Sequence, residues 1–92
     1  MKKIRVHVYI SGRVQGVGYR YSAILQAEKL GITGWVRNTH DNKVEAVFEG
    51  EENVIEEMLV WCKKGPSLAF VTDIEIQKRA YTGEFTSFTV RG

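Results

Sequence analysis

The strongest constraint on the fold is one continuous stretch in which a strand pattern leads into a glycine-rich loop and then into a helix pattern. Residues 4–10 alternate apolar and polar side chains without a break, which is typical of a strand with one buried face. Three glycines follow within seven residues, at Gly12, Gly16 and Gly18, and Arg20 stands where the helix pattern begins. Glycines let the backbone turn through positive φ and approach a ligand closely. The stretch therefore predicts a strand, a tight loop and a helix in direct succession.

The chemistry of this loop is that of an anion-binding site. Successive backbone N–H groups in a tight turn, together with a helix N-terminus, carry partial positive charge. Arg20 adds a planar guanidinium that can hold an oxyanion by two hydrogen bonds. The common nucleotide motifs do not fit, because a P-loop needs Lys before Ser or Thr and a dinucleotide fingerprint needs a third glycine, where this chain has Tyr19, Arg20 and Tyr21. Taken alone, the loop also fits an exposed connection with a free arginine.

The rest of the chain predicts two helices and four further strands. A helix of about three turns follows the loop and ends at Gly31, and a second helix spans residues 51–64. Strands are expected over residues 33–39, 43–50, 71–77 and 86–91. This order predicts one α+β domain over residues 1–92 with the ferredoxin-like split βαβ plan, β-α-β-β-α-β plus a short C-terminal strand. An antiparallel sheet would carry both helices on one face, and its usual strand order, 4-1-3-2, would put the first strand in the middle.

The same periodicities predict which side chains are buried. The inward positions of the helices are Ala23, Ile24, Ala27, Leu30, Val54, Ile55, Met58, Leu59, Trp61 and Cys62, and those of the later strands are Val44, Ala46, Phe48, Ile74, Ile76, Phe88 and Val90. The outward positions of the strands include His7, Trp35, Glu45, Val47 and Glu49. His40 falls in the turn between two strands and is expected to be an exposed loop residue.

Asn38 is the second polar residue of interest. If Val36 packs inward, Asn38 also points inward near the end of its strand, because side chains two apart share a face. An unpaired amide there would cost about 1–3 kcal/mol. Asn38 therefore either caps the hairpin turn or offers a hydrogen bond to a site, and the strand pattern alone leaves both open.

Composition limits the class of protein. The chain has 92 residues, a net charge of +2 and a single cysteine, Cys62, which excludes an internal disulfide and favours a buried free thiol. No apolar run is long enough to span a membrane and no signal peptide is visible, so a cytoplasmic protein is expected. The small positive charge gives no argument for a nucleic-acid partner.

Two segments resemble the signatures of the acylphosphatase family. The first is the run from Gly12 to Arg20, and the second is the run from Gly34 to Asn38. Gly65 and Pro66 after the second helix and an end strand containing Phe88 also fit, so the resemblance covers nearly the whole chain. Two residues depart from the family pattern: Tyr19 stands where Phe or Met is usual, and Asn42 stands where the hairpin usually has Gly.

The resemblance implies metal-independent hydrolysis of the carboxyl–phosphate bond of small acyl phosphates, without a cofactor. By resemblance, Arg20 binds the phosphoryl oxygens and Asn38 orients the attacking water. The backbone N–H groups that would bind phosphate belong to Gln15, Gly16, Val17, Gly18 and Tyr19. No nucleophilic side chain is expected, because neither Cys62 nor a serine lies in the loop beside a plausible base. A monomer without a membrane or nucleic-acid partner is expected.

Two alternatives come from other classes of protein. RNA-recognition domains share the element order, but they present aromatic side chains where Glu45, Val47 and Glu49 stand here. A non-catalytic anion sensor could use the same loop, and neither Arg20 nor Asn38 excludes it. A turnover assay with an acyl phosphate separates the sensor from the enzyme.

Overall fold

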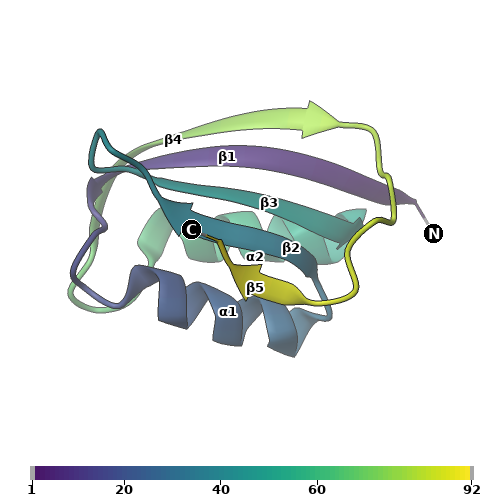
Figure 1. Ribbon diagram of the computed structural model, residues 1–92, viewed down its shortest axis with the longest axis horizontal. Coiled ribbons are helices and arrows are strands. Elements are labelled where there is room, and N and C mark those ends of the chain that lie inside the picture. The colour runs from purple at the N-terminus through teal and green to yellow at the C-terminus, as the bar shows by residue number, and fades with distance from the viewer. Residues whose placement is uncertain (1, 92) are drawn as a thin grey trace.

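The computed structural model describes residues 2–91, which form a five-stranded sheet with two helices on one face (Figure 1). The elements are β1 (Lys3–Arg13), α1 (Tyr19–Leu30), β2 (Thr33–Asn38), β3 (Val44–Glu51), α2 (Glu52–Lys64), β4 (Phe70–Arg79) and β5 (Phe88–Val90). The strand order is β4-β1-β3-β2-β5, which is the expected 4-1-3-2 order with β5 added beyond β2. The ferredoxin-like plan predicted from the sequence is confirmed.

The sheet is mixed, not wholly antiparallel as expected. The pairs β1–β3, β1–β4 and β2–β3 are antiparallel, whereas β5 runs parallel to β2 and aligns Phe88 with Gly34 and Val90 with Val36. The reason is the route of the chain after β4. Residues 80–87 cross one end of the sheet and reach the end at which β2 begins, so that β5 enters in the same direction as β2 (Figure 1).

The core lies between the sheet and the helices. α2 packs against β1, β3 and β4, and α1 packs against β2 and β5. Fully buried side chains include Val6, Val8, Ile10, Val36, Ala46, Phe48, Ile55, Met58 and Cys62. Neither α1 nor α2 has the length and apolar character that a membrane-crossing helix requires.

Two apolar side chains that were expected to be buried are exposed. Ile76 on β4 is 39% exposed and Val90 on β5 is 47% exposed. Both lie on edge strands, where a side chain on the helix side of the sheet has a neighbouring strand on only one flank. For Val90 this leaves one side open towards the pocket described below.

The outer face of the sheet carries the two glutamates of β3 as expected, but they are buried. Glu49 is 1% exposed because Arg5 and the segment 80–87 cover it, with Arg5 Nε 2.7 Å from Glu49 Oε2. Glu45 is 6% exposed and lies 2.6 Å from both His7 Nε2 and Arg37 Nε. These carboxylates therefore form ion pairs with Arg5 and Arg37 on the outer face.

Candidate anion-binding site

The C-terminal ends of β1 and β2 meet the N-terminus of α1 at one end of the molecule, and a pocket of about 340 Å³ lies between them. The residues that line the pocket are Val14, Gly16, Gly18, Tyr19, Arg20, Tyr21, Ile24, Asn38 and Val90. Five of the seven site residues predicted from the sequence are among them, including both Arg20 and Asn38. The other two, Gln15 and Val17, lie in the same loop.

The loop turns into α1 through glycines at positive φ. Gly16 has φ 75°, and Gly18, which precedes the first helical residue, has φ 79° and ψ 18°. This is the left-handed conformation that side chains disfavour. Within residues 2–91, no hydrogen bond is donated by the N–H groups of residues 15–19, and the first bond of this region runs from Ser22 N–H to the Gly18 carbonyl at 3.0 Å. The N–H groups of residues 15–19 therefore have no acceptor among the described residues.

Arg20 extends from the first turn of α1. Its side chain is exposed and lines the pocket, and among the described residues it forms no ion pair with a carboxylate. The first turn of α1 contains no acidic residue. The guanidinium and the positive end of the helix dipole therefore act in the same place, which favours an anion.

Asn38 ends β2 and lines this pocket, and among residues 2–91 its side chain forms no hydrogen bond with the hairpin turn. Thr39 caps the turn instead, since its N–H donates to the Lys43 carbonyl at 2.9 Å and its Oγ1 accepts from Lys43 N–H at 3.0 Å. Asn38 Oδ1 is buried and has no hydrogen-bond partner among residues 2–91. A buried acceptor without a partner is costly, and the amide has to turn before Oδ1 can reach a molecule in the pocket.

Gln15 and Val17 can contribute only their backbone to the pocket. The Gln15 side chain points to the hairpin, where Nε2 donates to the carbonyls of Thr39 and Lys43, both at 2.9 Å. The Val17 side chain packs against the core. Gln15 thereby joins the loop after β1 to the turn after Asn38 by two hydrogen bonds.

Tyr19 anchors the loop to α2. Its ring is 2% exposed and lies 5.3 Å from that of Trp61 between centroids, and its hydroxyl donates to the Cys62 carbonyl at 2.7 Å. Burial raises the pKa of Tyr19, so the hydroxyl remains a donor. Gly65 makes room for the ring, because a Cβ at that position would lie 2.7 Å from Tyr19 Cε2.

Cys62 is held as a buried thiol. Burial raises the pKa of Cys62 to about 12, with a smaller opposing contribution from the neighbouring Tyr19 hydroxyl. A protonated and inaccessible thiol is a poor nucleophile. Within residues 2–91, no three His, Cys, Asp or Glu side chains are grouped so that they could hold a metal ion.

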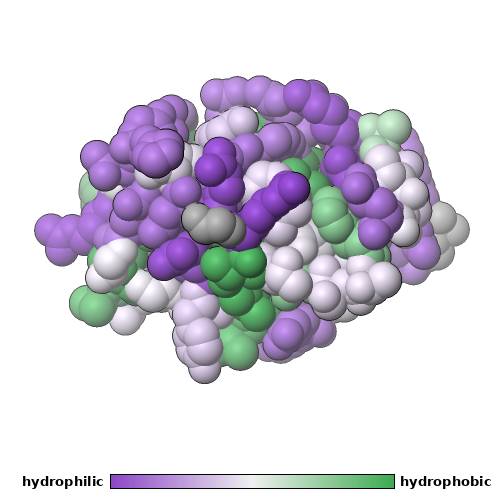
Figure 2. Space-filling view, viewed as in Figure 1, coloured by the Kyte–Doolittle hydropathy of each residue, from purple (hydrophilic) through white to green (hydrophobic). Residues whose placement is uncertain are grey.

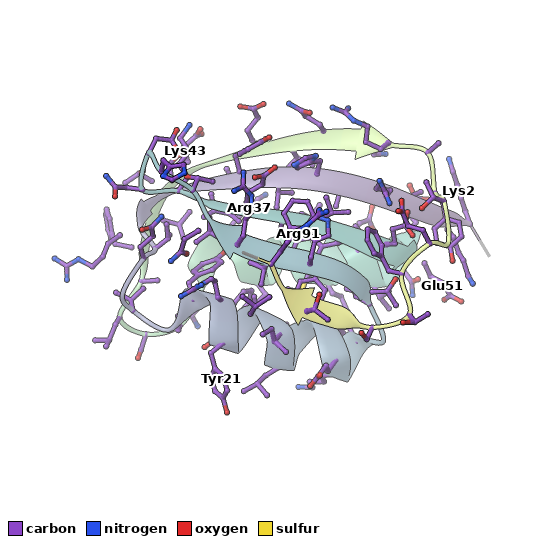
Figure 3. The ribbon with its side chains drawn as sticks, in the orientation of Figure 1. Lys2, Tyr21, Arg37, Lys43, Glu51 and Arg91 are labelled. Carbon is purple, nitrogen blue, oxygen red and sulfur yellow. The ribbon has the colours of Figure 1, made fainter. Side chains whose placement is uncertain are left out.

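The sequence reasoning missed four pocket residues: Val14, Tyr21, Ile24 and Val90. Ile24 could have been found, because it lies one helical turn after Arg20 and shares its face. Tyr21 is 68% exposed, and its ring extends from α1 away from the sheet (Figure 3). Val90 had no local signal, since alternation alone predicts that it is buried.

Comparison with known proteins shows which family has a similar sequence and fold. Residues 6–90 match the sequence profile of the family described as Acylphosphatase. The chain is 54% identical over 86 residues to an acylphosphatase of Methylococcus capsulatus, covering 94% of each chain. It is 48% identical over 90 residues to an acylphosphatase of a Roseiflexus species, covering 98% of this chain and 97% of the relative. The crystal structure of acylphosphatase from Bacillus subtilis is similar with a TM-score of 0.93 and 32% identity, covering 97% of this chain and 99% of that one.

Proposed function

The chain belongs to the acylphosphatase family and is a hydrolase that acts on acyl phosphates, and on this premise we propose how its pocket performs the reaction. The substrate class is small acyl phosphates, and the products are a carboxylate and inorganic phosphate. One observation carries the proposal. Among residues 2–91, N–H groups, a guanidinium and an amide oxygen without partners belong to residues of one loop and one pocket.

The phosphoryl group binds between the loop and Arg20. The N–H groups of residues 15–19 donate to its oxygens, and the guanidinium of Arg20 neutralises the charge with two directed hydrogen bonds. The transition state of phosphoryl transfer is loose and spreads charge over these same oxygens, so donors fixed in place supply much of the catalysis. The exposed position of Arg20 lets it meet the substrate without first breaking an ion pair.

Asn38 orients the attacking water. The water donates one O–H to the amide oxygen once the amide turns Oδ1 to the pocket, and this leaves an oxygen lone pair free to face phosphorus. An amide has little charge and cannot accept the proton of the water as a base would, so the role of Asn38 is to orient the water. The unpaired state of Oδ1 in the protein supports this role, because binding the water supplies the missing hydrogen bond.

The chemical step needs no nucleophile from the protein. The water oxygen forms a bond to phosphorus while the bond from phosphorus to the carboxyl oxygen breaks, and the carboxylate leaves with the electron pair. The proton of the water passes to a phosphoryl oxygen of the substrate. A carboxylate is a good leaving group, so no general acid is required to protonate it. The buried thiol of Cys62 takes no part.

A turnover assay with benzoyl phosphate tests the proposal, because hydrolysis changes its ultraviolet absorbance. We expect hydrolysis that inorganic phosphate inhibits competitively, since the product occupies the same loop. Binding of phosphate without any hydrolysis would identify an anion sensor instead. We further propose that the chain acts as one domain and as a monomer in the cytoplasm, with neither a membrane nor a nucleic acid as its partner.

A further inference from the structure

One wall of the pocket is apolar and open. Val90 at the end of β5 is 47% exposed, Ile24 on α1 is partly buried, and Val14, which also lines the pocket, is buried. Figure 2 shows apolar surface where the end of β5 meets α1. None of these side chains carries a group that could bind phosphate or activate water. The proposed mechanism therefore assigns no role to the apolar side chains of this wall.

The direction of Val90 is fixed by its neighbours. Phe88, two residues earlier, is buried and stacks on Phe48 with ring centroids 5.6 Å apart. Arg91 turns to the opposite face and lies over the ring of Trp35, 4.8 Å from its centroid, while its N–H donates to the Val36 carbonyl at 2.9 Å. Alternation along the strand then leaves Val90 on the side of α1, next to the pocket.

The pocket has a polar part and an apolar part. Gly16, Gly18, Arg20 and Asn38 form the polar part, and Ile24 and Val90 belong to the apolar part. Arg20 is the only Lys or Arg among the described residues that line the pocket. The volume of about 340 Å³ lies in the range of small-molecule sites rather than of a site for a single oxyanion.

We propose that the apolar wall of Ile24 and Val90 binds the acyl group of the substrate, so that the enzyme selects acyl phosphates with an aromatic or branched aliphatic acyl group. The inference rests on the proposed function. A phosphoryl group held by the loop and Arg20 leaves its acyl substituent beside this wall. Apolar contact there removes hydrocarbon from water, whereas an acyl group with a second carboxylate has no further lining cation to bind.

The test compares benzoyl phosphate with acetyl phosphate, which share the phosphoryl group and differ in the acyl group. Val90→Thr keeps a β-branched side chain suited to a strand but replaces a methyl group with a hydroxyl. We expect the ratio of kcat/KM for benzoyl phosphate to that for acetyl phosphate to fall about three- to fivefold. The matched control is Val60→Thr, since Val60 is 68% exposed on α2 and does not line the pocket. The control should keep the ratio of the unmodified chain.

Binding gives a second readout that does not depend on turnover. Benzoylphosphonate and acetylphosphonate have a carbon–phosphorus bond that resists hydrolysis, and titration measures their affinities. Val90→Thr should weaken the binding of benzoylphosphonate about three- to fivefold, the factor expected for the kcat/KM ratio. The affinity for inorganic phosphate should not change. If the ratio does not change in Val90→Thr, even where kcat/KM falls equally for both substrates, the assignment of the wall is wrong although the proposed function stands. If the unmodified chain hydrolyses neither substrate, the proposed function fails and this inference fails with it.

Discussion

The hydroxyl of Tyr19 donates a 2.7 Å hydrogen bond to the backbone carbonyl of Cys62, which joins the first residue of α1 to the last turn of α2. Both groups are buried, and 43 positions separate them in the chain. The bond gives a physical role to a residue that departs from the family pattern, because Phe or Met at this position would leave that carbonyl unpaired. It also holds the end of the glycine-rich loop against the core.

Replacing Tyr19 with Phe should lower stability more than activity. The ring and its contact with Trp61 remain, but the Cys62 carbonyl loses its donor, and we expect a loss of about 1–3 kcal/mol in the free energy of unfolding. Urea denaturation measures the loss, and Tyr81→Phe, which changes a 41% exposed tyrosine, is the control. Because burial raises the pKa of Tyr19, the loss should be the same at pH 6 and pH 9. A variant as stable as the unmodified chain would show that water or a local shift replaces the hydroxyl.

The Gln15 side chain does not line the pocket, but its removal should weaken phosphate binding. Its side chain holds the carbonyls of Thr39 and Lys43, so Gln15→Leu keeps the size of the side chain but releases the loop from the hairpin that follows Asn38. We expect weaker phosphate binding, together with a roughly tenfold loss of kcat, because small misplacements of catalytic groups are costly. Titration and turnover measure the two effects. Unchanged kcat with a well-folded variant would show that the loop holds its shape without this tie.

The burial of Glu49 predicts how stability depends on pH. Burial by itself raises the pKa of Glu49, but hydrogen bonds from Thr82 and Arg5 outweigh it, and the net pKa is lowered. A carboxylate with a lowered folded pKa stabilises the protein above its unfolded pKa of about 4.3. The stabilisation is lost as the pH falls through the lower, folded value. The free energy of unfolding should therefore decrease as the pH drops below about 4.3.

Glu49→Gln should remove part of this pH dependence. The amide keeps the shape of the side chain but weakens the hydrogen bonds from Arg5, Thr82 and Gly83, and at neutral pH we expect a loss of about 1.5–3 kcal/mol. Chemical denaturation between pH 3 and pH 7 measures both quantities. Glu56→Gln on the exposed face of α2 is the control. An equal slope below pH 4.3 in both variants would assign the acid sensitivity to other carboxylates.

Much of the fold could be predicted from the sequence because the local patterns are strong. Seven alternating residues in β1, the glycine stop at Gly31 and the apolar face of α2 each agree with the ferredoxin-like plan. The parallel pairing of β5 could not be predicted, because it depends on the path of residues 80–87 across the end of the sheet. The burial of Glu45 and Glu49 was missed for a related reason. Glu49 is covered by Arg5 and Thr82, and Glu45 is contacted by His7, and periodicity does not reveal these partners because they are far away in the chain.

The same sequence patterns could predict part of the candidate site. Arg20 and the glycines beside it in the sequence predict an anion-binding loop, and Gly16, Gly18 and Arg20 line the pocket. Asn38 could be placed on the inward face, but the strand pattern does not show that Thr39 forms the hydrogen bonds of the turn. Val90 and the roles of the Gln15 and Tyr19 side chains depend on contacts between elements far apart in the chain.

Hydrolysis should not depend on a divalent metal. The charge of the transferring phosphoryl group is met by Arg20 and by the N–H groups of residues 15–19, and a carboxylate leaving group needs no Lewis acid. Turnover of benzoyl phosphate should survive dialysis against a chelator. Simple phosphate monoesters should react far more slowly, because nothing proposed here activates a poor leaving group. A loss of activity on dialysis that added Mg²⁺ or Mn²⁺ restores would contradict the mechanism.

The roles of Arg20 and Asn38 should separate when binding and turnover are measured side by side. Arg20 is proposed to hold the phosphoryl oxygens in both the ground state and the transition state, so Arg20→Ala should weaken phosphate binding and turnover together. Arg20→Lys should recover little, because an ammonium lacks the planar fork. Asn38 is proposed to hold only the water. Asn38→Ala should therefore bind phosphate nearly as the unmodified chain does, while kcat falls roughly 10²–10³-fold.

The measurement is the phosphate dissociation constant by titration beside kcat for each variant, with folding checked by circular dichroism. Asn38→Asp serves as a further control, because it keeps the size of the side chain and an acceptor oxygen but adds a negative charge beside the phosphoryl group. This variant should lose phosphate binding through repulsion, which Asn38→Ala should not. If Asn38→Ala stays folded yet loses phosphate binding as severely as Arg20→Ala, then Asn38 is a ligand of the anion. The water would then have to be oriented by another group, and the loop N–H groups that have no acceptor in the protein would be the next to test.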